Sequence, residues 1–233
     1  NLAHNENEVT RLSNDVFTMD KILLGDVFIR GGSSSGTHVL EEGRPIGQFY
    51  GLVCNGIDEN GRYIMVDKDG DGEISDPADY DYIGSAQPKL TYGITNTFRY
   101  KNFDLSFFLR GTIGNDILNA TRMAYAQSGF LPGTNALDDP LTYTLSETPR
   151  FSNYYLEKGS FMRLDNLTLG YKIKSLNGIR VYFTAQNLFV ITKYKGLDPE
   201  VPMGSGDGLT PGAEPREFYP KARTFSVGLN LNF

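Results

Sequence analysis

The chain has 233 residues, a formal net charge of -6 at pH 7, one cysteine and no tryptophan. Cys54 stands alone, which excludes an internal disulfide, and an acidic chain without a basic cluster is a poor candidate for binding nucleic acid. No apolar run approaches the roughly 18 residues that a membrane-spanning helix needs. The high content of phenylalanine, tyrosine and glycine favours β-strands joined by turns.

The amino-terminal third has the weakest pattern of alternation. We expect strands at about 1–12 and 27–40, although residues 31–36 are all glycine or serine and also fit a loop, a bulge or a linker. Residues 45–54 are predicted to form a further strand. The fold class is therefore decided by the later segments.

An acidic segment follows, in which carboxylates stand at alternate positions over residues 67–73. Carboxylates with this spacing can face one centre, and Gly72 permits the sharp turn that a calcium loop needs. Ala78 stands where the last acidic ligand is expected, with acids on both sides of it. The sequence predicts a structural Ca²⁺ site, and the alternative is a solvated acidic turn. The candidate ligands are Asp67, Asp69, Asp71, Glu73, Asp76 and Asp79.

The clearest hairpin covers residues 90–112. Alternate residues of the predicted strand 90–100 are mostly apolar, and the residues between them are polar. A tight turn at 101–102 leads into a second strand at 103–112. Predicted strands at 161–173 and 179–191, joined by a turn at 174–178, continue the pattern. The final strand, 223–233, has five apolar residues on one face and small or polar residues on the other.

Long connections at 55–88, 113–160 and 192–221 alternate with these short turns. Loops of such length are uncommon inside compact domains, whereas transmembrane barrels have short periplasmic turns and long extracellular loops. Strands with one apolar and one polar face suit a wall between lipid and water. The sequence therefore predicts an all-β fold, an antiparallel transmembrane β-barrel with long extracellular loops, whose apolar face contacts outer-membrane lipid.

Motifs across residues 43–233 resemble the C-terminal part of SusC-like TonB-dependent outer-membrane transporters. Each motif is weak alone, but they occur in the family's order. The motif-bearing segments are 43–51 (GRPIGQFYG), 67–84 (ending YIG), 87–93 (QPKLTYG), 100–105 (YKNFDL), 155–164 (YLEKGSFMRL), 166–171 (NLTLGY), 186–189 (QNLF), 192–200 (TKYKGLDPE) and 219–220 (YP).

The resemblance implies that residues 1–233 are the C-terminal segment of a barrel of about 22 strands, without the amino-terminal plug domain. It implies import of glycans, or of peptides, across the outer membrane of a Gram-negative bacterium. The implied partners are the remainder of the same barrel, a SusD-like surface lipoprotein that acts as a lid, and TonB, contacted through the amino-terminal region missing here.

The sequence gives little support for catalysis, because neither histidine has a neighbouring nucleophile and no pair of acids stands apart from general loop acidity. We therefore expect a protein that is not an enzyme. Aromatic residues in the long loops are candidates for stacking on cargo or packing against the lid, with packing inside the loops as the alternative. They are Tyr125, Phe130, Tyr143, Tyr154, Tyr155 and Tyr194.

Three other functions stay open at this stage. A passive porin would share the barrel but lack a plug and a TonB-contacting segment. A secreted β-sandwich that binds carbohydrate would bury the apolar strand faces against a second sheet. A siderophore receptor belongs to the same class of transporter and is disfavoured by the order of the motifs.

Overall fold

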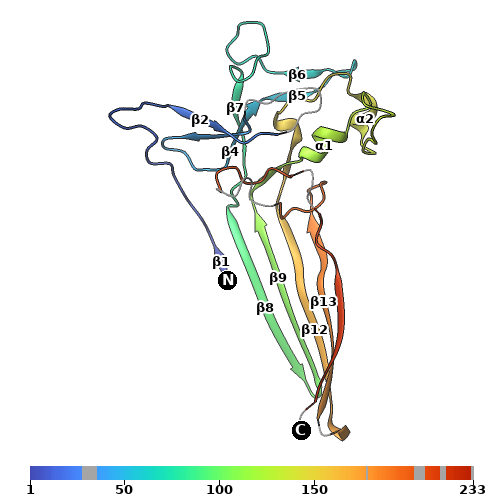
Figure 1. Ribbon diagram of the computed structural model, residues 1–233. Helices are drawn as coiled ribbons and strands as arrows, with labels where there is room; N and C mark the ends of the chain where they lie inside the picture. Colours follow the sequence, from blue (N-terminus) through green and yellow to red (C-terminus); the bar gives the residue numbers. More distant parts are fainter. Residues whose placement is uncertain (28–35, 177, 202–207, 216–218, 232–233) are drawn as a thin grey trace.

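The computed structural model describes residues 1–27, 36–176, 178–201, 208–215 and 219–231. One long β-sheet forms the lower part of the molecule, and a layer of shorter sheets, loops and small helices lies above it (Figure 1). None of the described helices is long and apolar enough to cross a membrane. The secondary structure is dominated by antiparallel strands, which confirms the predicted all-β class.

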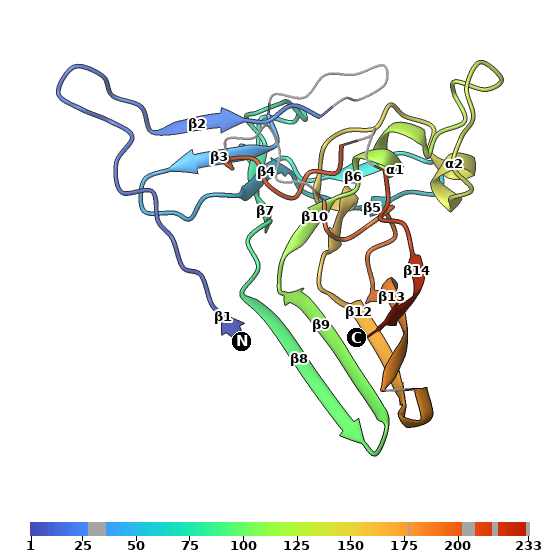
Figure 2. The same ribbon diagram turned by 60° about the horizontal axis from the view of Figure 1, so that its bottom comes forward.

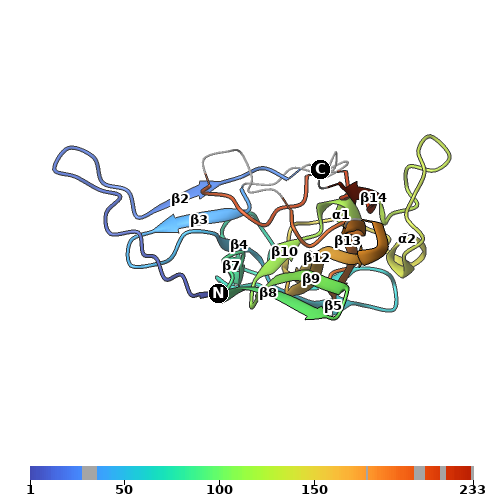
Figure 3. The same cartoon turned by 90° about the horizontal axis from the view of Figure 1, so that it is seen from below.

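The long sheet has six strands in the order β1-β8-β9-β12-β13-β14, and every neighbouring pair is antiparallel. Figures 1 and 2 show the long strands side by side, and in the view from below they follow one another along an arc (Figure 3). The strands are β1 (Leu2–Ala3), β8 (Leu90–Tyr100), β9 (Phe103–Ile113), β12 (Phe161–Ile173), β13 (Ile179–Thr192) and β14 (Thr224–Asn230).

Alternation along these strands gives the sheet two different faces. The outer face is apolar and open to the surroundings: Phe98 is 52% exposed and Tyr100 is 71% exposed. Its other exposed members include Ile94, Phe103, Leu169, Phe183, Phe225, Val227 and Leu229. The inner face carries charged and hydroxyl side chains. Because side chains alternate along a strand, one register places most of the large apolar side chains on the same side.

Short turns and long loops lie at opposite ends of this sheet (Figure 1). At the lower end Lys101, with φ of 53°, forms the tight turn between β8 and β9. Near this end the short 3₁₀ helix η2 (Lys174–Leu176) precedes β13. A bulge between Leu164 and Asn166 interrupts β12 near its upper end. The alternation of short and long connections agrees with the predicted order.

The upper layer contains three small sheets and the helices. One sheet has the order β2-β3-β4-β7, and two further sheets pair β5 with β6 and β10 with β11. The strands are β2 (Lys21–Leu24), β3 (His38–Glu41), β4 (Gln48–Leu52), β5 (Cys54–Ile57), β6 (Tyr63–Met65), β7 (Tyr80–Ser85), β10 (Asp116–Leu118) and β11 (Leu156–Lys158). The helices are α1 (Ala120–Tyr125), α2 (Pro140–Thr144) and the 3₁₀ helix η1 (Asn153–Tyr155).

The main cluster of enclosed apolar side chains lies in this upper layer. Phe49, Leu118, Met123, Phe151 and Tyr155 are each at most 1% exposed and belong to one packed cluster. The long sheet has no comparable partner on its outer face within the described residues. The cluster therefore holds the loops together, whereas neither face of the long sheet is covered by a comparable cluster of described residues.

The structure departs from the predicted strands mainly in the amino-terminal third. A strand was expected at 1–12, but only Leu2–Ala3 pairs with the sheet. Within 27–40 the structure has β3, starting at His38, and residues 28–35 lie outside the described part, as do residues 232–233 of the predicted final strand. The segment 55–88, expected to be a loop, contains β6 and β7. These small strands pair over long sequence separations, which local alternation does not reveal.

Candidate functional site

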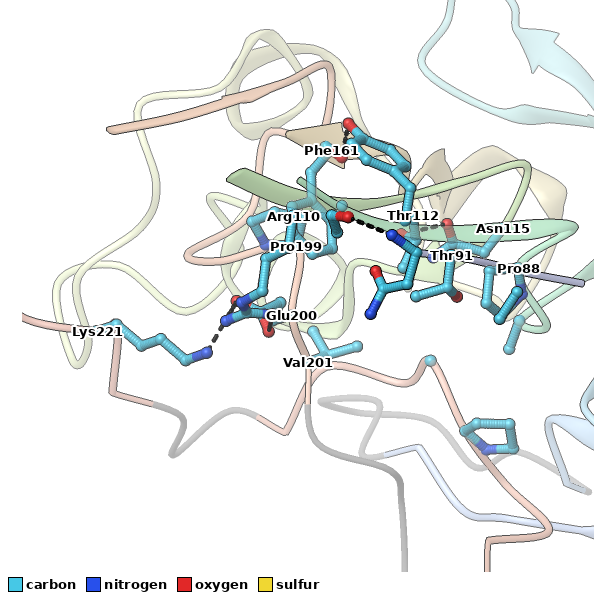
Figure 4. Close-up of a pocket in the computed structure, with 18 of the residues that line it drawn as sticks. Pro88, Thr91, Arg110, Thr112, Asn115, Phe161, Pro199, Glu200, Val201 and Lys221 are labelled. Carbon is cyan, nitrogen blue, oxygen red and sulfur yellow. Dashed lines mark hydrogen bonds and ion pairs between the residues drawn. The ribbon is translucent and has the colours of Figure 1, made fainter. Parts of the chain in front are cut away.

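A cavity of about 660 Å³ lies against the inner face of the sheet, under the loops (Figure 4). Thr91, Arg110 and Thr112 of β8 and β9 line one side of it. Glu200 and Lys221, from the connection between β13 and β14, line the other. The remaining walls are largely apolar or small, with Phe108, Phe161, Pro88, Pro199 and Pro211 among them. The cavity therefore combines apolar surface with a few charged groups.

Glu200 is the centre of a network of ion pairs in this wall. Its carboxylate accepts hydrogen bonds from Arg110 Nη2 at 3.0 Å and from Lys221 Nζ at 2.8 Å. Arg163 Nε lies 2.8 Å from the same carboxylate. Burial raises the pKa of Glu200, but hydrogen bonds from Arg110 and Lys221 outweigh it and hold the pKa below its ordinary value. Glu200 is therefore ionised at neutral pH.

Two further carboxylates balance the three cations. Arg163, which is 4% exposed, donates to Asp198 at 2.6 Å, and Arg110 donates to Asp165 at 3.0 Å. Three positive and three negative side chains thus neutralise one another. Because residues 198 and 200 precede the loop and Lys221 follows it, the network fixes both ends of that loop to the wall.

A second ion pair crosses the inner face near the short turns. Arg180 of β13 donates to Asp104 of β9 through Nε at 2.9 Å and also through Nη2. The pair passes over Gly170 of β12, where an added Cβ would lie 2.5 Å from both partners. Glycine is required here because any side chain would occupy the space of the ion pair. The inner face therefore carries paired charges at two heights, in the Glu200 network and in the Arg180–Asp104 pair.

The predicted acidic segment forms an exposed turn in the upper layer. Carboxylate oxygens of Asp67, Asp69 and Asp71 lie within 4.8 Å of one another, which brings three of the six predicted ligands together. A hydrogen bond from the Asp71 amide lowers the pKa of Asp69, but desolvation and the neighbouring carboxylates outweigh it and raise that pKa overall. These oxygens fit the oxygen preference of Ca²⁺. Calcium binding stays a prediction.

The other three predicted ligands are placed differently. Asp79 accepts hydrogen bonds from the backbone amides of Ser75 and Lys68, and these bonds lower its pKa. Asp76 pairs with Arg150 at 2.7 Å. Glu73 lies in the turn and contributes its amide to a hydrogen bond with Asp71. Asp79 and Asp76 are thus engaged in holding the turn, and the structure does not bring their carboxylates into the group of three.

The predicted aromatic residues fall into two groups. Tyr143 is 75% exposed and Phe130 is 37% exposed, and Tyr125 is half-buried. Tyr154 is half-buried and packs edge-on against Tyr155, with ring centroids 5.6 Å apart. The first three and Tyr154 keep some surface that a cargo or a partner could touch.

Tyr155 and Tyr194 fit the alternative that the sequence left open, which is packing inside the loops. Tyr155 has no exposed surface and Tyr194 is 6% exposed. Burial is the main cause of a raised pKa for both phenols. The hydroxyl of Tyr155 bonds that of Tyr63 inside the loop layer. Both side chains are enclosed in the loop layer, so neither ring is available for stacking.

Sequence reasoning did not identify Arg110, Glu200 or Lys221 as site residues. Arg110 carries a signal, since it is a charged residue on the polar face of an otherwise regular strand. Arg163 lies on the inner side as well, opposite Arg110 in the ladder between β9 and β12. The distant acids that pair with it could not be assigned from spacing alone.

Comparison with known proteins finds relatives along the whole chain. It is 35% identical to the TonB-dependent receptor SusC of Bacteroides thetaiotaomicron, covering 100% of the chain and 24% of that receptor. It is 34% identical to TonB-dependent receptor P3 of Formosa agariphila, covering 84% of the chain and 23% of that receptor. The structure of the RagAB peptide transporter matches with a TM-score of 0.73 and 25% identity, over 98% of the chain and 26% of that structure's chain. No family model matches.

The chain spans about a quarter of the length of the relatives it matches. Their names describe receptors and a transporter, and none describes an enzyme. The structural match covers the long sheet together with the loop layer, because it extends over 98% of the chain. The predicted fold class and the predicted resemblance are both confirmed by these relatives.

Proposed function

Because the chain belongs to the SusC-like TonB-dependent receptors, we propose that it forms part of the wall and the extracellular loops of an outer-membrane barrel that imports nutrients. The remainder of the same barrel would continue the sheet from its two edges, β1 and β14, whose outer sides are unpaired within the described residues. Closure removes such edges, which are otherwise prone to aggregation. The import activity belongs to the whole receptor, of which this chain is a segment.

The exposed apolar face of the long sheet is the observation that carries this proposal. Val227 is 75% exposed and Leu229 is 62% exposed, and they continue a band that crosses all the long strands. Leaving large apolar side chains in water costs roughly 1.5–3 kcal/mol each. Lipid removes that cost, whereas a soluble β-sandwich would remove it with a second sheet. The described residues provide no second sheet over this face.

The loop layer supports the placement of the partners. Its exposed aromatic residues, with Tyr143 the most exposed of the predicted set, lie at the end opposite the short turns and offer contact surface for a SusD-like lipoprotein lid. TonB would supply energy through a region of the receptor outside this chain. The names of the relatives support dependence on TonB, and the resemblance of the motifs supports the lid. In this proposal, cargo that passes the lid enters the cavity under the loops.

The cargo is proposed to be an oligosaccharide or a peptide. The wall of the inner cavity has apolar patches beside charged side chains that are paired with one another. Such a wall has few unpaired charges that would hold a polar oligomer tightly. The RagAB relative is described as a peptide transporter. The sequence motifs favoured glycans as cargo. The name of this relative supports peptides equally.

Uptake by cells carrying the full-length receptor tests the proposal. Fluorescent oligosaccharides and fluorescent peptides of matched size are supplied to cells with the receptor, without it, and with the receptor after collapse of the proton-motive force. The proposal expects receptor-dependent uptake of one cargo class that stops when the force is collapsed. Uptake that persists without the force would identify a passive porin instead. If the receptor increases the uptake of neither cargo class, import of these cargoes is contradicted.

A further inference from the structure

A groove of about 480 Å³ opens on the outer, apolar side of the long sheet, at its loop end. It lies over β9, β12 and β13, with Ile113 and Ile191 at its apolar rim and Lys158 and Lys193 at its polar rim. These isoleucines are 48% and 58% exposed. The groove shares Tyr92, Thr112 and Phe161 with the cavity that contains Glu200, but its two isoleucines lie on the apolar face of the sheet.

The groove is a fixed feature of the sheet. Tyr92 lies beside Gly111 and donates through its hydroxyl to the carbonyl of Phe161 at 3.3 Å. Thr192 Oγ1 donates to the carbonyl of Ser160 at 2.9 Å, and the Ser160 hydroxyl accepts from the amide of Gly114 at 2.9 Å. These bonds join three strands at the floor of the groove, so its shape does not depend on mobile side chains.

The charge of the groove is positive. Its nine lining residues include two lysines and no acid. Lys158 pairs with Asp116 at 2.7 Å, yet the lysine side chain is 77% exposed while the aspartate is 16% exposed. Lys193 is exposed and forms no ion pair with any residue that the structure describes. The groove therefore offers one free ammonium group and a second that faces outward, which suits a phosphate.

The position of the groove selects the kind of phosphate. Ile113 and Ile191 continue the apolar face that the proposed function places in lipid, and the lysines begin where the strands end. Apolar groups below and cations above match a lipid whose chains lie along the strands and whose headgroup is anionic. The missing strands would attach at β1 and β14, so they leave the groove over β9, β12 and β13 uncovered.

We propose that this groove binds the phosphorylated headgroup of a membrane lipid in the leaflet on the loop side of the membrane. The inference rests on the proposed function, because it needs the outer face to contact lipid. Lys158 and Lys193 contact the phosphate, the hydroxyls of Ser160 and Tyr92 border it, and the acyl chains pack on Ile113 and Ile191. The two lysines and two isoleucines that would contact the lipid are not among the residues that line the inner cavity.

The test uses the full-length receptor in nanodiscs, with lipid A as the phosphorylated probe and dephosphorylated lipid A as its counterpart. Native mass spectrometry measures the ratio of the two lipids retained. A variant with Lys158→Gln and Lys193→Gln is compared with a matched control, Lys101→Gln and Lys174→Gln, which removes equal charge at the opposite end. Each surface lysine contributes about fivefold in affinity for an anionic headgroup. The double variant at the groove should therefore lose about 25-fold of the preference, and the control none.

Four results would overturn the inference. The preference for phosphorylated lipid could persist in the Lys158 and Lys193 variant, which would show that these lysines do not bind it. The preference could fall equally in the control, which would show that it depends only on the total surface charge. Millimolar inorganic phosphate could displace the lipid fully, which would make the site a phosphate site without lipid specificity. Insertion is measured on the same samples, and uptake is measured in cells that carry the same variants. A receptor that inserts and imports cargo but shows no lipid preference contradicts this inference alone, whereas one that does not insert contradicts the proposed function as well.

Discussion

Glu200 accepts two hydrogen bonds from Arg110, a residue 90 positions earlier in the chain, at 2.5 and 3.0 Å. The contact joins the loop after β13 to the inner wall at β9. The same carboxylate meets Lys221, which lies just before the last strand. One glutamate thus ties together the two ends of a long loop and the sheet that carries it. The motif at residues 192–200 thus contains the two acids, Asp198 and Glu200, that anchor the loop in the structure.

We predict that Glu200→Gln loosens this loop. An amide keeps the shape of the side chain but removes the charge that faces three cations, at a cost of about 1–3 kcal/mol. Limited proteolysis of the full-length receptor should then cut between residues 193 and 223 faster than in the wild type. Asp138→Asn, which changes an exposed acid without an ion pair among the described residues, is the control. Equal protection of the loop in both variants would contradict the anchoring role.

His38 provides a prediction of pH dependence. Burial lowers its pKa from 6.5 to about 4, against a smaller effect of the hydrogen bond to the Pro211 carbonyl. The native state therefore holds neutral histidine, which contacts that carbonyl at 2.8 Å. Since the unfolded state gains the proton first as pH falls, stability is complete above pH 6.5 and declines toward pH 4, by roughly 1.4 kcal/mol per unit at most.

Thermal unfolding of the full-length receptor between pH 7.5 and 4.5 measures this effect. The His38→Gln variant can still donate to Pro211 but cannot titrate, so the difference in melting temperature between the two proteins should shrink as pH falls. His4, which is exposed, serves as the control in a His4→Gln variant and should leave the pH profile unchanged. A profile of the His38 variant that runs parallel to the wild type would exclude His38 as its source.

The acidic turn is predicted to bind Ca²⁺ weakly. Asp67, Asp69 and Asp71 supply three carboxylates within 4.8 Å of one another, and exposed sites of this kind bind in the range of roughly 10⁻⁴–10⁻³ M. Terbium luminescence, displaced by calcium, reports occupancy on the full-length receptor. Asp69→Asn should weaken binding at least tenfold, and Glu59→Gln, an exposed acid outside the group, should not. Undiminished binding in Asp69→Asn would place calcium elsewhere.

The loop aromatics are predicted to separate by burial. Tyr155→Ala removes a fully enclosed ring from the packed cluster and should destabilise the loop layer by about 3–5 kcal/mol. Tyr143→Ala removes an exposed ring and should leave the melting temperature unchanged while reducing uptake of cargo. Paired measurements of melting and uptake check both. Unchanged uptake in Tyr143→Ala would remove that residue from the path of the cargo.

The long sheet could be predicted from sequence because its information is local. Apolar and polar side chains largely alternate along strands β8 and β9, which have 11 residues each and meet at a tight turn. Both the pairing of these strands and their two faces therefore follow from residues that are close in the sequence. The sequence motifs, taken together, indicated the family of transporters. The apolar ending of the chain indicated the same two-faced strand, and β14 pairs with β13 as that pattern requires.

The loop layer could not be predicted in the same way. Strand β7 pairs with β4 about 30 residues earlier, across the acidic turn, and no local pattern marks the partner. Residues 1–12 alternate weakly, but there Val9 bonds Arg44 and the side chain of Glu42 holds the amides of Leu12 and Ser13. The ionic network also joins residues from three distant segments. Each of these contacts depends on tertiary packing.

Site-directed spin labelling of the full-length receptor in liposomes tests the contact between lipid and the outer face most directly. Cys54 is replaced by serine, and single labels are placed at 94 and 98 on the outer face and at 95 and 97 on the inner face of β8. Lipid contact predicts that labels at 94 and 98 relax with dissolved oxygen and are shielded from a water-soluble nickel reagent, with the reverse pattern at 95 and 97. Labels at 94 and 98 that are shielded from both reagents would show that protein covers this face, and the membrane account would be wrong.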